Sequence, residues 1–350
     1  MRARCGALTL ASLLWAATAT ATAAPQVPIG AADRAFIRGL YANWYLPAAV
    51  AFGQQAQSLT GAVQALCDAQ KEDAAAAALG AARLQWQVTV DAWERFSAVR
   101  GGALLSRRSP REIDFMPTRP ESIRRAIDAD DGDKAMELVG TPAKGLPALE
   151  WLLWTQAAAP HSPACRYAVR LTRDVAAEAE ALRAAYARSL EHGWDDEETE
   201  YALYEFLNLF DAGIQKLWWE DMDRPQVKTA GSTRAASFSR AASASTVLAW
   251  RAHWQGLRAL AVGVPDRTDA PSLHAYLLAK GHGAAATRLT HLVADVDRAM
   301  DAFETGSRNV IAPARVNQAV AALKALQQHI ETDTAHALQY VISFFDEDGD

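Results

Sequence analysis

The spacing of apolar side chains constrains the fold of this chain more than any other feature. Large apolar residues recur every three or four positions, which places them on one face of an α-helix. The clearest stripes are Leu203, Leu207, Phe210, Ile214 and Leu217; Trp86, Val90, Trp93 and Phe96; Val247, Trp250, Trp254 and Leu257; and Ile330, Thr334, Ala337 and Val341. The one hint of a strand, at residues 88–90, falls inside a helical stripe. The pattern predicts an all-α protein.

Breaks between the stripes divide the chain into two parts. A segment rich in Ser, Ala, Thr and Gly runs from Arg224 to about Ser245, between two sets of helical stripes. A length of 350 residues is also enough for about two domains. We therefore expect two helical domains, each similar to a four-helix bundle and packed against the other, at residues 28–224 and 234–350.

Composition and charge exclude two classes of protein. A hydrophobic fraction of 50% with 22% charged residues is incompatible with an intrinsically disordered chain. A net charge of -6 and a pI near 5.8 lack the basic excess of a nucleic-acid-binding protein. Nucleic acid is therefore not an expected partner.

The N-terminus has the pattern of a secretory signal peptide. Arg2 and Arg4 precede a short apolar run, and a cleavage site of small residues follows at residues 21–23. The apolar run is shorter than the ~20 residues that a membrane span needs. Cys5 lies too early to be a lipoprotein cysteine. We expect residues 1–23 to be removed and the mature chain to reach the periplasm without a lipid anchor.

Removal of the signal leaves two cysteines, Cys67 and Cys165. An even pair in an oxidising compartment is expected to form a disulfide. The bond would close a loop of 98 residues. The alternative, a catalytic cysteine, has less support because no histidine adjoins either residue in the sequence.

Several motifs resemble those of one known family. Residues 145–150 read Gly-Leu-Pro-Ala-Leu-Glu and precede an apolar helix, residues 113–117 read Ile-Asp-Phe-Met-Pro, and residues 344–350 end in Phe-Phe-Asp-Glu-Asp-Gly-Asp. In this order, with cysteines near residues 67 and 165, they resemble the imelysin-like family, whose signature is G-x-H-x-x-E. The resemblance implies a periplasmic protein of two helical bundles, linked to iron acquisition, in a family first classed as metallopeptidases.

The chain departs from that signature at its histidine. Gly145 and Glu150 match, but the histidine position holds Pro147, which has no side-chain donor or acceptor. The family's histidine–glutamate metal site therefore cannot form from these positions. Glu150 is then either a capping or buried paired carboxylate, or a carboxylate that contacts a ligand together with Asp114 and Arg119. Arg240 lies where the family has an Arg/Ser segment, and the resemblance places it at the cleft between the bundles.

A separate group of residues could bind a metal. His329, Asp333 and His336 have the spacing of one helical stripe, and imidazole with carboxylate suits zinc or iron. The adjacent stripe from Ile330 to Val341 is more apolar, so these side chains could instead be solvated residues at its flank. No zinc-peptidase H-E-x-x-H motif is present.

These observations favour a non-catalytic binding protein connected with iron or metal uptake. Its cofactor is undefined, with a divalent iron or zinc ion as the candidate. Its partners would be a small ligand or metal ion and a transport component of the outer or inner membrane. Two alternatives stay open: a metal-dependent peptidase that uses other ligands, and a degenerate scaffold that binds a partner protein.

Overall fold

The computed structural model describes residues 28–129, 136–229, 236–265, 267, 269–303 and 311–342. In these residues every regular element is a helix and none is a strand, which confirms the all-α class. The predicted signal peptide and the acidic tail at residues 346–350 lie outside the described residues. Within the described ranges, no helix is long and apolar enough to cross a membrane.

The first half of the chain forms α1 (Ala31–Gly39), α2 (Leu46–Cys67), α3 (Glu72–Phe96), α4 (Ala103–Ser106), α5 (Ser109–Ile113), α6 (Pro120–Asp128), α7 (Gly145–Glu150) and α8 (Pro163–His192). The second half forms α9 (Asp196–Gln215), α10 (Arg224–Val227), α11 (Thr246–Val262), α12 (Leu273–Ala279), α13 (Gly283–Asp301), α14 (Pro313–His329) and α15 (Ala335–Leu338). Short 3-10 turns are η2 (Met136–Leu138) and η3 (Thr141–Ala143). Wider π turns are η1 (Leu40–Tyr45), η4 (Trp151–Thr155), η5 (Lys216–Asp223) and η6 (Ile330–Thr334).

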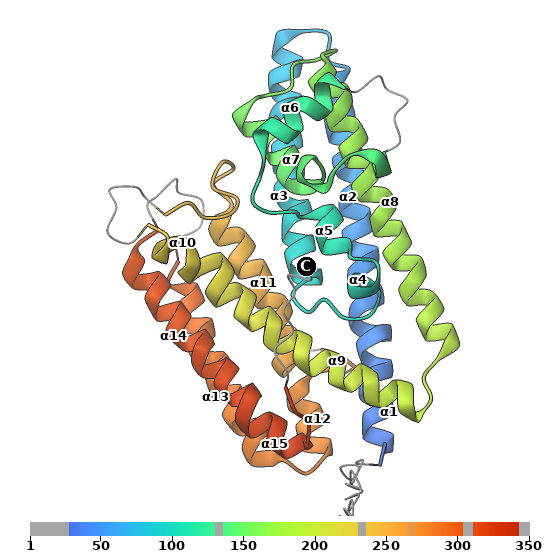
Figure 1. Ribbon diagram of the computed structural model, residues 1–350, viewed down its shortest axis with the longest axis vertical. Helices are drawn as coiled ribbons and strands as arrows, with labels where there is room; N and C mark the ends of the chain where they lie inside the picture. The colour runs from blue at the N-terminus through green and yellow to red at the C-terminus, as the bar shows by residue number, and fades with distance from the viewer. Residues whose placement is uncertain are drawn as a thin grey trace, which may run out of the picture.

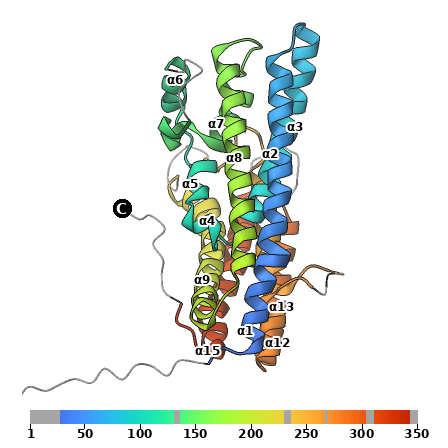
Figure 2. The same cartoon turned by 90° about the vertical axis from the view of Figure 1, so that its right-hand side faces the viewer.

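Three long helices form the first group. α2, α3 and α8 run side by side along the long axis of the molecule, and α2 packs against both of the others (Figures 1 and 2). The predicted stripe on α3 lies in the core between them: Trp86, Val90, Trp93 and Phe96 are each 1% exposed or less. Burial of these large side chains is the main term that holds the group together.

A second group contains α9, α11, α12, α13 and α14 and is inclined to the first (Figure 1). α13 packs against α12 and α14, and α14 packs against α9. α11 packs against α3, so the two groups meet there, and α9 contacts α1. The predicted boundary between residues 224 and 234 stays a prediction.

Two glycines allow the groups to approach closely. A Cβ on Gly256 of α11 would lie 2.4 Å from the carbonyl oxygen of Arg95, at the end of α3. A Cβ on Gly213 of α9 would lie 2.1 Å from the carbonyl oxygen of Ala98. Since both atoms are backbone, any larger residue would push the helices apart.

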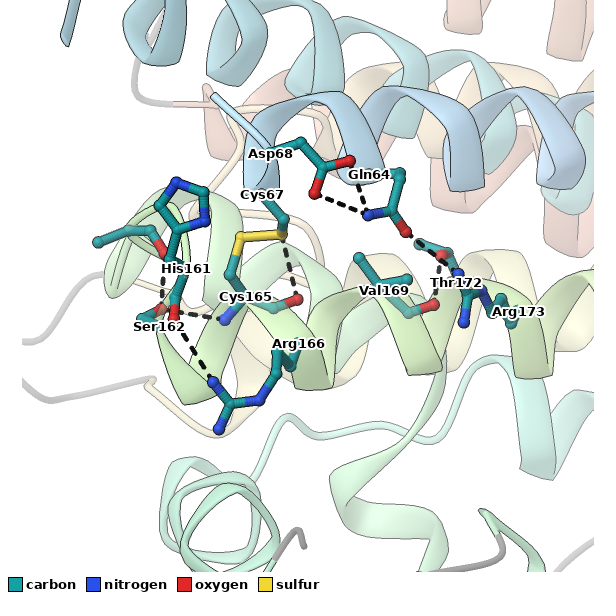
Figure 3. The surroundings of a disulfide bond; sticks show 11 residues. Gln64, Cys67, Asp68, His161, Ser162, Cys165, Arg166, Val169, Thr172 and Arg173 are labelled. Carbon is teal, nitrogen blue, oxygen red and sulfur yellow. Dashed lines mark hydrogen bonds between the residues drawn. A yellow bond between two sulfur atoms is a disulfide. The ribbon is translucent and has the colours of Figure 1, made fainter. Parts of the chain in front are cut away.

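The predicted disulfide is confirmed. Cys67 ends α2, Cys165 lies in the first turn of α8, and their Cα atoms are 5.5 Å apart (Figure 3). The backbone N–H of Cys165 also donates to the Ser162 hydroxyl at 3.1 Å, which caps the start of α8 (Figure 3). The bond therefore fixes two antiparallel helices to each other at one end.

The last helical stripe is shorter than predicted. Ile330 and Thr334 are buried, but Val341 lies beyond the end of α15 and is 75% exposed. Gln339 adopts a left-handed conformation with φ of +60°, and the N–H of Tyr340 donates to a carbonyl in the last turn at 3.0 Å. This is a common way to end a helix, and it removes Val341 from the stripe.

Candidate functional site

A tight turn at residues 239–246 leads into α11. Arg240 and Ala244 have positive φ angles of +62° and +56°, which residues other than glycine rarely adopt. The Thr246 hydroxyl fastens the turn by donating to the Ser239 carbonyl at 2.6 Å. Such backbone conformations cost about 1–3 kcal/mol each and cluster at functional sites. The side chains on this turn are therefore candidates for function.

Arg240 projects from the turn into a buried position, with 1% of its side chain exposed. Its Nη2 donates to both carboxylate oxygens of Asp114, at 2.7 and 2.6 Å, and to Glu94 Oε1 at 3.2 Å. The guanidinium lies over the Trp86 ring at 5.6 Å. Its Nε and Nη1 are buried and have no hydrogen-bond partner among the described residues.

The negative charges around Arg240 affect its pKa more than its burial does. Burial alone lowers the pKa of a guanidinium, but the negative charges of Asp114, Glu94 and Glu150 raise the pKa of Arg240 well above its ordinary value. Arg240 is therefore a permanent cation among three carboxylates.

Glu150 is the last residue of α7 and is 4% exposed. Its Oε1 accepts two hydrogen bonds from Ser243, from the backbone N–H at 2.9 Å and the hydroxyl at 2.6 Å. Its other oxygen, Oε2, accepts no hydrogen bond from the described residues. Gly145 opens the helix with φ of +71°, where a Cβ would lie 2.1 Å from the carbonyl oxygen of Ile113. Only glycine lets α7 pack this closely beside Asp114.

The structure brings together three of the four predicted ligand-binding residues: Asp114, Glu150 and Arg240. Arg119 is exposed, and its guanidinium lies over the Phe115 ring at 5.4 Å. It contacts none of the other three within the described structure. We call Glu94, Asp114, Glu150, Arg240 and Ser243 the junction cluster, because they join segments of both helix groups.

Glu94 and His253 belong to this region but were not predicted from the sequence. Glu94 is 6% exposed and His253 is 1% exposed, with His253 Nδ1 3.7 Å from Glu94 Oε2. Burial raises the pKa of the Glu94 carboxyl, but His253, Lys216 and Arg240 together hold it well below its ordinary value. Glu94 is therefore ionised.

The apolar stripes of the sequence contain a signal for Glu94 and His253. Glu94 follows Val90 by four positions, and His253 follows Trp250 by three, so both fall on buried helical faces. A charged side chain on a buried face is costly unless it is paired. The sequence thus marks both positions as needing a partner, although it does not name one.

The predicted metal candidates are only partly brought together. His329 Nδ1 lies 2.9 Å from Asp333 Oδ2, and its Nε2 lies 3.1 Å from the carbonyl oxygen of Ala285. His329 is 4% exposed, so it is not a solvated residue at the flank of the helix. Because both ring nitrogens face oxygen atoms, neither is free for a metal.

A resident catalytic metal does not fit the described residues. No group of three or more His, Cys, Asp and Glu side chains among them is arranged to hold a metal ion. At the signature position Pro147 is buried in α7 and supplies no ligand beside Glu150. No metal-dependent step can be assigned to this cluster.

Fold and site together define a class: an all-α protein of two packed helix groups with a buried ionic cluster between them. The chain belongs to the imelysin family, because the family model Peptidase_M75, described as Imelysin, matches residues 45–332, most of its length. No curated protein sequence matches the chain.

Two solved structures share the fold. An imelysin-like protein from Psychrobacter arcticum 273-4 has a TM-score of 0.76 at 16% identity, covering 92% of this chain and 100% of that one. A structure from Parabacteroides distasonis ATCC 8503, described as an iron-regulated protein A precursor, has a TM-score of 0.71 at 13% identity, covering 89% and 95%. At these identities the likeness establishes the fold alone.

Proposed function

We propose that this imelysin-family protein is a non-catalytic iron-binding protein and that its ligand binds at the junction cluster. One observation carries the proposal: Nε and Nη1 of Arg240, which lies beside Glu150, are buried and have no hydrogen-bond partner among the described residues. Buried polar atoms in native proteins are almost always hydrogen-bonded. These atoms are therefore the ones expected to bind a ligand.

The chemistry of these atoms indicates the form of the ligand. Glu150 offers one oxygen to a metal ion, which is too few to hold a bare ion tightly. The free N–H groups of Arg240 instead suit the anionic oxygens of a carboxylate. Iron that is already bound to carboxylate ligands would suit both residues. Arg240 would donate to those ligands, and Glu150 Oε2 would face the iron.

Two further features support the proposal. The structure from Parabacteroides distasonis, which shares this fold, is described as an iron-regulated protein. In addition, Arg240 is 1% exposed, so a ligand reaches it only when the turn at residues 239–246 moves. The positive φ angles of Arg240 and Ala244 make this turn a site of stored strain, which ligand-driven movement would release.

The proposal includes a compartment and a partner. Removal of residues 1–23 would leave the mature chain in the periplasm. There it would carry iron to or from a transport component of the outer or inner membrane. Binding is preferred to peptidase activity because Pro147 replaces the signature histidine.

Calorimetric titration of the mature protein tests the proposal, with ferric citrate as the probe. The protein should bind ferric citrate, Glu150→Gln should weaken binding at least about tenfold, and Arg119→Gln should leave it unchanged. Equal binding by the Glu150→Gln variant, or no binding by the natural sequence, contradicts the proposed site. Chelator-sensitive cleavage of a protein substrate would instead support the peptidase alternative.

A further inference from the structure

A second region of the molecule has the shape of a ligand site. A groove of about 650 Å³ lies where the α12–α13 turn and the start of α13 meet η6 and α15, and it shares no residue with the junction cluster. Its volume is within the range of about 300–1,000 Å³ that is usual for small-molecule sites. We call it the α13 groove.

Small residues keep the α13 groove open. One side is formed by residues 281–285, which read Gly-His-Gly-Ala-Ala, so that only His282 carries a large side chain there. Gly281 has φ of +86°, a conformation that favours glycine and that turns the chain sharply between α12 and α13. The backbone of this turn is therefore accessible from the groove.

Among the described residues, one carboxylate lines the groove, and it already has a partner. Asp333 is paired with His329, whose other ring nitrogen faces the carbonyl oxygen of Ala285 at 3.1 Å. The carboxylate of Asp333 therefore already has a partner within the chain.

Three other polar side chains that line the groove can donate hydrogen bonds. Arg288, His282 and His336 line the groove, and none of their side chains forms a hydrogen bond or ion pair with another described residue. A guanidinium presents a planar fork of N–H groups that matches phosphate oxygens, and an imidazole supplies a further N–H. A permanent cation and two imidazoles that line one groove favour an anion over a cation or a neutral molecule.

We propose that the α13 groove binds a small organic phosphate, with Arg288 holding the phosphate group and His282 and His336 completing its contacts. The groove is much larger than one phosphate group, so the organic part occupies the remaining space. This site is independent of the iron site proposed above, because the two share no residue.

Calorimetry on the mature chain tests the proposal with glycerol 3-phosphate as the probe and glycerol as its uncharged counterpart. The natural sequence should bind the phosphate ester and not glycerol, and Arg288→Gln should weaken binding at least about tenfold, since a charge-assisted contact to phosphate is lost. Arg298→Gln is the matched control, because Arg298 lies on the same helix, outside the groove, and pairs with Asp295.

The controls separate the two sites. Arg298→Gln and Glu150→Gln should both bind glycerol 3-phosphate as the natural sequence does, and Arg288→Gln should still bind ferric citrate. The proposal is overturned if the natural sequence fails to bind glycerol 3-phosphate, if glycerol binds equally well, or if Arg288→Gln binds the ester without loss.

Discussion

Arg240 and Asp114 lie 126 residues apart in the sequence, and a single guanidinium nitrogen of Arg240 reaches both carboxylate oxygens of Asp114, at 2.6 and 2.7 Å. The same nitrogen also contacts Glu94. One cation thus pairs with carboxylates from α3 and from the loop after α5, while two of its own nitrogens have no hydrogen-bond partner in the described part of the chain. The same residue thus stabilises the interface and carries the proposed ligand site.

Replacement of the cation should destabilise the protein strongly. Arg240→Met removes the buried cation that Glu94 and Asp114 share, and loss of one partner of a buried pair costs about 3–5 kcal/mol. Urea unfolding should show this decrease in the free energy of unfolding. Arg119→Met, at an exposed arginine, should change it by less than about 0.5 kcal/mol.

Asp211 should make stability depend on pH. It is 5% exposed, its Oδ1 has no partner among the described residues, and its Oδ2 accepts from Gln327 at 3.1 Å. Burial, with a smaller contribution from the charge of Glu331, raises its pKa from 3.8 to about 7. Between these values the folded protein keeps a proton that the unfolded chain releases, so the free energy of unfolding falls as the pH rises.

Asp211→Asn should remove this dependence. The variant is expected to be more stable than the natural sequence at about pH 8, by up to about 4 kcal/mol, and equally stable near pH 4. Denaturant unfolding across this pH range measures the difference. A constant difference at every pH would contradict the assigned titration.

A single methyl group added where α9 packs against the end of α3 should destabilise the protein. Gly213→Ala places a Cβ against the Ala98 carbonyl oxygen and should cost about 3 kcal/mol. Gly61→Ala is the matched control, because an added Cβ there has no described atom within 4 Å apart from its chain neighbours and the nearby backbone of its own helix. That change should stabilise α2 by about 0.5–1 kcal/mol. Thermal unfolding of both variants checks the contrast.

The disulfide should contribute a large part of the stability. It closes 98 residues between Cys67 and Cys165, and loss of such a bond typically costs about 2–5 kcal/mol. Dithiothreitol should lower the thermal unfolding midpoint of the natural sequence by the amount that corresponds to this loss in the free energy of unfolding. It should have no effect on the double variant Cys67→Ala/Cys165→Ala, and an equal effect on both would rule out the bond as its cause.

The sequence predicts local features of this protein better than its long-range ones. The stripe at Trp86 and Trp93 defines α3 because helical periodicity is a property of neighbouring residues. Glu150 and Asp114 could be placed by motif, and Arg240 by its position in a family pattern. Glu94 was missed because its partner Arg240 is 146 residues away, and nothing local to either residue encodes their contact.

At the last described helix, the sequence predicts a longer buried stripe than the structure shows. The periodicity predicts a stripe as far as Val341, because period alone does not show where a helix ends. The left-handed conformation of Gln339 ends it earlier, and glutamine is not a residue that signals such an end. Similarly, the burial of His329 depends on the Ala285 carbonyl of another helix, which no local pattern reveals.

The most direct test of the proposed iron site is the anomalous scattering of iron in crystals of the mature protein soaked with ferric citrate. The account predicts an iron peak beside Glu150 Oε2, with the citrate oxygens next to the free nitrogens of Arg240. The crystals must have no lattice contact on the turn at residues 239–246, so that the turn can move. In such crystals, an iron peak at the α13 groove alone, or no iron peak, would contradict the proposed iron site.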